Sequence, residues 1–159
     1  AGDRINKDTR SHTGVLITCN GVPVQWRSKK QPSTSISSAA AEICAMAEAA
    51  RDSRLNAWKS EELGYEGRKP IVVQVDNTAS IIFQSKMNAD SRIKGIFDLR
   101  WQWVRDLQNS DEVKAVKVDT KNNLADILTK CMSRVTYNSL LDQQKQKVLS
   151  VLNLETAVP

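Results

Sequence analysis

The chain has 159 residues, of which 40% are hydrophobic and 26% are charged, as in a globular protein with room for one hydrophobic core. No apolar run approaches the roughly 20 residues of a membrane span and no signal peptide opens the sequence, so no membrane partner is expected. The net charge of +5 and pI of 9.2 favour a polyanionic partner without requiring one.

Hydrophobic spacing and turn residues predict alternating strands and helices. Asn20-Gly21 is a strong hairpin signal, and the run Ile71–Asp76 ("IVVQVD") is apolar enough to predict a buried strand. In chain order we expect strands at 15–18 and 22–27, a long helix that Ser37 or Ser38 caps and Gly64 and Gly67 end, a strand at 71–76, a short helix through 81–83, a basic loop at 87–95, a helix at 97–107, a strand at 113–118, a helix capped by Asn122 or Asn123, and an amphipathic helix at 135–152.

This order predicts one α/β domain over residues 1–159. Two strands separated by helical crossovers imply a parallel pair. The hairpin added to that pair gives a mixed sheet with helices on its faces. Ligands gather at the carboxyl ends of parallel strands in such sheets, and Asp76 ends the first of these two strands.

The cysteines and the single histidine limit the kinds of metal and catalytic site that the chain can form. Cys19, Cys44 and Cys131 are far apart and stand in apolar surroundings, so we expect buried free thiols in a reducing compartment. His12 is the only histidine and lies in a polar segment, so we expect it at the surface. A Cys/His zinc site and a His-activated nucleophile are therefore both disfavoured.

Three acids are candidates for a metal site. Asp76 ends a strand, Glu42 interrupts an alanine-rich helix start, and Asp126 stands in "LADIL" near another expected helix start. Each has an ordinary explanation, since Asp76 can cap a helix and the other two can be solvated acids favoured by a helix dipole. Together they indicate carboxylates that converge, and Mg²⁺ or Mn²⁺ prefers such oxygen ligands. Two ions about 4 Å apart can hold the attacking and leaving oxygens of a phosphodiester.

Four segments carry a family resemblance: "VQWRSKKQPSTSISSAAAEICAMAEAA", "VVQVDNTASI", "DSRIKGIFDLRWQWVRD" and "TKNNLADILTK". In this order they resemble the ribonuclease H domain at the end of the Pol polyprotein of copia-type LTR retrotransposons, over about residues 1–152. The resemblance implies a ribonuclease-H-like fold and an Asp-Glu-Asp-Asp quartet holding two Mg²⁺ ions. Glu42, Asp76 and Asp126 match its last three acids.

The implied activity is endonucleolytic hydrolysis of the RNA strand of RNA–DNA hybrids, in which metal-activated water attacks phosphorus and the 3′ oxygen leaves. The implied partners are the hybrid and an upstream reverse transcriptase segment of the same polyprotein. The implied location is intracellular, in a cytoplasmic virus-like particle or the nucleus.

The sequence also departs from the family pattern. The family's first strand usually reads Asp-Ala-Asp-Trp-Ala-Gly-Asp and begins with the catalytic aspartate, whereas this chain opens on Ala1-Gly2-Asp3, the end of that pattern. We therefore expect a truncated first strand and little or no cleavage by this chain alone. Ala40 replaces a usual glutamate, and Lys94-Gly95-Ile96 lacks the loop histidine, which puts that loop's role in doubt.

Two functions stay open at this point: a retroelement ribonuclease H, or an impaired module of the same fold that binds nucleic acid or a partner without cutting. An integrase or transposase nuclease is disfavoured, because those enzymes place the helix glutamate last.

Asn77 is either a helix cap or a donor to the backbone or a 2′-hydroxyl. Trp103 is expected in the core, and Trp101 partly exposed. Basic residues expected to neutralise phosphates, if they are not simply solvated, are Lys29, Lys30, Lys86, Arg92, Lys94 and Lys121.

Overall fold

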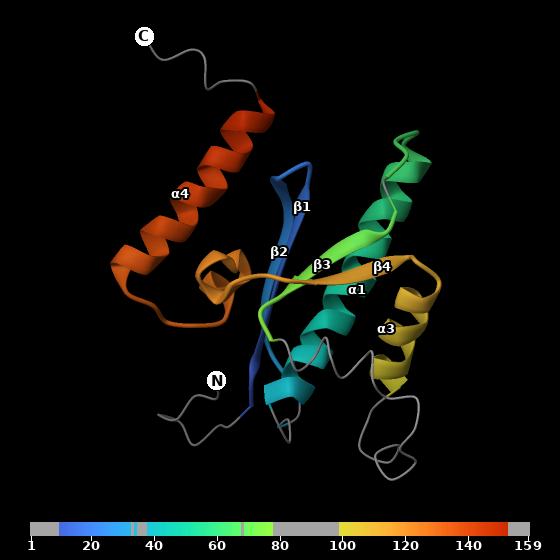
Figure 1. Ribbon diagram of the computed structural model, residues 1–159, viewed down its shortest axis with the longest axis horizontal. Helices are drawn as coiled ribbons and strands as arrows, with labels where there is room; N and C mark the ends of the chain where they lie inside the picture. The colour runs from blue at the N-terminus through green and yellow to red at the C-terminus, as the bar shows by residue number, and fades with distance from the viewer. Residues whose placement is uncertain (1–9, 33, 35–37, 68, 78–98, 153–159) are drawn as a thin grey trace.

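The computed structural model describes residues 10–32, 34, 38–67, 69–77 and 99–152 (Figure 1). The expected α/β class is confirmed, and the expected helix through 81–83 and basic loop at 87–95 fall outside the described residues. The elements in chain order are β1 (His12–Cys19), β2 (Val22–Lys30), α1 (Ser38–Glu62), β3 (Ile71–Val75), α3 (Leu99–Asn109), β4 (Val113–Lys117), the short 3₁₀ segments η1 (Thr120–Asn122) and η2 (Leu124–Leu128), and α4 (Arg134–Val151).

The hairpin of β1 and β2 forms as the sequence predicts. Asn20 and Gly21 both have positive φ angles, 51° and 84°, which is the turn geometry that the twist of a tight hairpin favours. The antiparallel ladder is longer than expected, because it continues to the pair His12 and Lys30. His12 is therefore a half-buried strand residue and not part of a polar tail.

The main core lies between the helices α1 and α3 and one face of the β3–β4 pair. These two strands are parallel, as expected, with Ile71 opposite Val113 and Val75 opposite Lys117. Trp103 is partly buried and packs against this core, so its expected place in the core is confirmed only in part. The buried members are Met46, Ala47, Ala50, Val73, Val75, Val104, Leu107 and Val113.

Two expectations about the strands are wrong. Within the described residues the strands form two separate two-stranded sheets and not one mixed sheet. Helix α1 packs against both the hairpin and β3, so the two sheets share a helix in place of a hydrogen-bond ladder. The strand β3 is also not buried on both faces: Val72 is 56% exposed, because α1 and α3 cover only the face that carries Val73 and Val75.

The expected burial of the thiols is also wrong. All three cysteines are free, but Cys19 and Cys131 are exposed and only Cys44 is partly buried. Cys19 ends β1 beside the hairpin turn, and Cys131 stands in the connection between η2 and α4, where little packs over them. No helix in the described ranges is long and apolar enough to cross a membrane.

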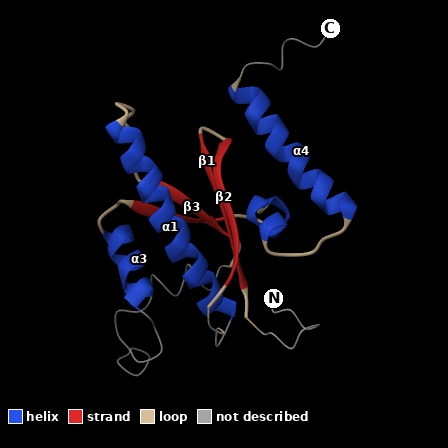
Figure 2. Cartoon of the chain, turned by 180° about the vertical axis from the view of Figure 1, so that it is seen from behind, coloured by secondary structure: helices blue, strands red, loops and turns tan. Residues whose placement is uncertain are grey.

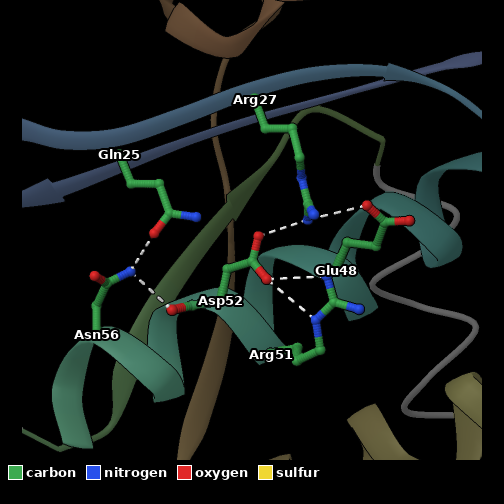
Figure 3. A network of polar contacts seen from close by, with 6 residues as sticks. All are labelled: Gln25, Arg27, Glu48, Arg51, Asp52 and Asn56. Atoms are coloured by element: carbon green, nitrogen blue, oxygen red, sulfur yellow. Dashed lines mark hydrogen bonds and ion pairs between the residues drawn. The ribbon is translucent and has the colours of Figure 1, made fainter. Parts of the chain in front are cut away.

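A polar network joins the hairpin to α1 (Figure 3). Arg27 of β2 pairs with both Asp52 and Glu48 of α1, and Arg51 donates two hydrogen bonds to the buried carboxylate of Asp52. One turn further along, Asn56 donates to Gln25 of β2 at 2.7 Å. On the other side of the hairpin from α1 and α3 lies α4 (Figure 2), which buries Leu140.

Candidate acidic site

Asp76 directly follows the last residue of β3 and is half-buried. The parallel ladder continues next to it, since the backbone N–H of Val118 donates to the carbonyl of Val75 at 2.9 Å. The prediction that Asp76 stands at the carboxyl end of the parallel pair is therefore confirmed.

Glu42 lies one turn into α1, between the buried residues Ala41 and Ile43, and its own side chain is half-buried. The start of this helix is held by Gln31, which is only 5% exposed. Its amide nitrogen donates to the carbonyl of Ala41 and to the hydroxyl of Thr13 in β1, both at 3.0 Å. Gln31 thus fixes the helix start to the hairpin, directly beside Glu42.

Asp126 lies in η2 and is buried. The sequence predicts an α-helix here, but the segment is a short 3₁₀ turn, a form that chains use in pieces of this length. Asn123 caps it, as expected, by accepting from the N–H of Ala125. The amide of Asn123 donates to Asp126 Oδ1 at 3.2 Å, and Lys130 Nζ lies 2.8 Å from Asp126 Oδ2.

The hairpin holds η2 in place through two small residues. A Cβ atom at Gly14 of β1 would lie 2.5 Å from Thr129 Cγ2 and 2.9 Å from the carbonyl oxygen of Ala125, so only glycine fits. Ser28 of β2 donates to the carbonyl of Leu128 at 2.6 Å. These contacts fix the segment that carries Asp126.

The three acids and Lys130 act on one another electrostatically. Burial raises the pKa of Glu42 above its ordinary value, the charges of Asp76 and Asp126 raise it too, and the charge of Lys130 opposes them. Partial burial acts to lower the pKa of Lys130, but its hydrogen bond to Asp126 and the charges of the acids outweigh this and raise it overall.

This arrangement is a charge cluster and not a closed cage. Within the parts of the chain that the structure describes, no three His, Cys, Asp or Glu side chains gather closely enough to hold one metal ion. The cluster nevertheless offers hard oxygen donors in excess of positive charge, which is the chemistry that a divalent cation of the Mg²⁺ type requires.

The structure describes only some of the residues that were expected to contact nucleic acid. Lys29 is exposed and Lys30 half-buried at the end of β2, near the start of α1, to which Gln31 is bonded. Lys121 is exposed in η1, and Asn77 is half-buried next to Asp76. Lys86, Arg92 and Lys94 lie outside the described residues.

Four residues that shape the site were not singled out from the sequence: Gly14, Ser28, Gln31 and Lys130. A glycine inside a strand is a recognised signal of close approach, and an acid followed four residues later by lysine is a recognised pair. Gln31 and Ser28 carry no comparable signal, because their partners are set by the tertiary fold.

Comparison with known proteins finds the chain similar to segments of transposon polyproteins. It is 33% identical over 134 residues, 84% of its length, to the retrovirus-related Pol polyprotein from transposon TNT 1-94 of Nicotiana tabacum. Over 139 residues, 87% of its length, it is 31% and 30% identical to the retrovirus-related Pol polyproteins from transposons RE2 and RE1 of Arabidopsis thaliana. No family model and no solved structure matches the chain. It spans only 10%, 9% and 9% of these three relatives, and is therefore homologous to one segment of retrovirus-related Pol polyproteins from plant transposons.

Proposed function

We propose that the chain is a ribonuclease-H-like domain of a retroelement Pol polyprotein that hydrolyses the RNA strand of RNA–DNA hybrids. The observation that carries the proposal is the placement of three acids from separate elements: Glu42 one turn into α1, Asp76 at the end of β3 and Asp126 in η2, close enough for the charges of the two aspartates to raise the pKa of Glu42. These acids come from α1, the end of β3 and η2, and the family resemblance assigns the same three to metal binding. An antiparallel hairpin, a parallel pair and a helix that packs against both are elements of that fold, although the described strands form two sheets and not one.

Carboxylate oxygens are the donors that Mg²⁺ or Mn²⁺ prefers, but in the described residues no three carboxylate side chains are close enough to hold one ion together. Glu42, Asp76 and Asp126 would be three ligands of a two-ion site, and the resemblance implies a fourth acid on an upstream strand. The chemistry that the bound ions supply is activation of the attacking water and stabilisation of the leaving 3′ oxygen. The protein's own part is to hold these carboxylates in place: Gln31 fixes the helix of Glu42, and Gly14 with Ser28 fixes the segment of Asp126.

The hybrid is the proposed substrate because the chain is basic and carries exposed cations at the ends of its elements. Lys29 and Lys121 are exposed, and Trp26 of β2 presents an exposed ring on which a base can stack. Binding should therefore weaken as the salt concentration rises.

The test is Mg²⁺-dependent cleavage of a labelled RNA–DNA hybrid. It uses the 159-residue chain and a version extended upstream by an Asp-Ala-Asp-Trp strand, and in each the effect of Asp76→Asn is measured. We expect cleavage mainly in the extended protein and a loss of at least about 100-fold with Asp76→Asn, equivalent to about 3 kcal/mol of transition-state stabilisation. Asp142→Asn, at an exposed acid of α4, is the matched control. Cleavage that survives Asp76→Asn would remove the catalytic assignment.

A second candidate function is a module of the same fold that binds the hybrid without cutting it. It is favoured by one observation: both carboxylate oxygens of Asp126 already accept hydrogen bonds, from Asn123 and Lys130. Salt-sensitive hybrid binding in both proteins, with no cleavage in either, would establish this alternative.

A further inference from the structure

Lys130 brings a positive charge into the acid cluster. Its ammonium lies 2.8 Å from Asp126 Oδ2, and its charge also acts on Glu42 and Asp76. The neighbouring backbone closes the same turn, since the N–H groups of Thr129 and Lys130 both donate to the carbonyl of Asp126. One residue thus delivers a tethered cation to a carboxylate that the proposed function assigns to metal binding.

This pair differs from an ordinary surface ion pair. The side chain of Asp126 is 12% exposed, whereas that of Lys130 is 43% exposed, so the carboxylate is desolvated but the ammonium has a route to solvent. By contrast, Lys145 and Asp142 on α4 are 71% and 66% exposed and their charged atoms are 3.7 Å apart. Screening by water makes such an exposed pair weak, whereas the Lys130 pair holds a buried charge.

We propose that Lys130 is a built-in counter-cation that occupies Asp126 in the metal-free protein and leaves this carboxylate when a divalent cation binds. The inference rests on the proposed function, because it assumes that the ion binds at Asp126. Its consequence is that Lys130 limits the affinity of the site for the ion, since two cations compete for one desolvated carboxylate.

The direction of the effect separates this role from a purely structural one. If Lys130 is a competing cation, its removal makes the site more negative, so the site binds a divalent ion more tightly. The metal-free protein also becomes less stable. A residue that only holds η2 in shape would, once removed, loosen Asp126 and weaken both metal binding and stability.

The experiment measures Mn²⁺ binding to the full chain by electron paramagnetic resonance of the free ion, and the Tm in EDTA. We expect Lys130→Met to tighten Mn²⁺ binding by about tenfold. We also expect it to lower the Tm of the metal-free protein by about 2–4 °C. Lys130→Arg keeps the charge and adds a bidentate contact, so it should bind Mn²⁺ no more tightly than wild type. Lys145→Met is the matched control and should change neither value.

Each outcome decides a separate question. If Lys130→Met leaves the Mn²⁺ affinity unchanged or weakens it, the counter-cation role of Lys130 is wrong. In that case, Mn²⁺ binding by the wild-type protein still supports the proposed function. If the wild-type protein binds no Mn²⁺, or if Asp126→Asn does not change Mn²⁺ binding, then both the proposed site and this inference are wrong. Should Lys130→Met fail to fold, Lys130→Arg decides, because tighter Mn²⁺ binding by that variant contradicts the proposal.

Discussion

Helix α1 takes part in two groups of partly buried acids that differ in how their charge is balanced. In the polar network of Figure 3, Asp52 and Glu48 meet Arg27 and Arg51, so carboxylates and guanidinium groups are equal in number. The cations come from β2 and from α1 itself, and the group ties the hairpin to the helix.

In the acidic site, one turn from the start of the same helix, acids predominate among the described residues. There the carboxylates of Glu42, Asp76 and Asp126 outnumber the lysine, Lys130, whose charge acts on all three. A buried charge without a partner is costly, so a fold retains an excess of one sign only where something else offsets it. Buried acids alone therefore do not mark a site, and a group of acids whose charge is not balanced is the one to examine for a ligand.

The largest effect that we expect comes from breaking the balanced network. Asp52→Ala leaves Arg51 and part of the charge of Arg27 without their buried partner, and should lower the free energy of unfolding by about 3 kcal/mol. Urea unfolding measures this, with Asp142→Ala as the control, for which we expect a change of less than about 1 kcal/mol. Equal stabilities of the two variants would mean that the network contributes little to the fold.

A smaller effect is expected where the acidic site meets the hairpin. Gly14→Ala places a methyl group against the backbone carbonyl of Ala125, which cannot move without η2, and should cost about 1–3 kcal/mol of stability and weaken Mn²⁺ binding. Gly67→Ala is the control, because nothing lies within 4 Å of the added atom, and its effect should stay below about 1 kcal/mol. Wild-type Mn²⁺ affinity in Gly14→Ala would show that η2 is not held by this contact.

The smallest expected effect is a change in pH dependence without metal. The folded pKa of Glu42 is raised above its ordinary value of 4.5, so the stability it contributes is present below the unfolded pKa and is lost as the pH rises through the folded pKa. Glu42→Gln removes this loss, so the variant should gain stability relative to wild type as the pH rises above 4.5. Urea unfolding in EDTA across this range tests it, with the exposed Glu66→Gln as control. Parallel profiles for wild type and Glu42→Gln would contradict the electrostatic coupling.

The sequence predicts those parts of the structure that local signals determine. Asn20-Gly21 favours the tight turn of the hairpin, the apolar run after residue 70 forms β3, and Asn123 caps the segment that follows it. The position of Asp76 at a strand end follows directly from that run. Grouping it with Glu42 and Asp126 depended on convergent motifs and on the family resemblance, because no local pattern links residues so far apart.

Features that depend on distant packing could not be predicted. The exposure of Val72 follows from which face of β3 the helices cover, and the close fit at Gly14 follows from a turn more than a hundred residues later. The separation of the strands into two sheets is also a tertiary property, because hydrophobic alternation shows which residues face inward but not which ladder edges meet.

The hydrogen bond from Ser28 to Leu128 joins residues 100 positions apart, and it has a consequence for the order in which the protein assembles. The β1–β2 ladder needs only neighbouring sequence and can close early, whereas η2 can dock only after nearly the whole chain is available. The repulsion among the three carboxylates therefore arises only once η2 has docked. We expect loss of this contact to open the acidic site while the hairpin and the main core stay folded.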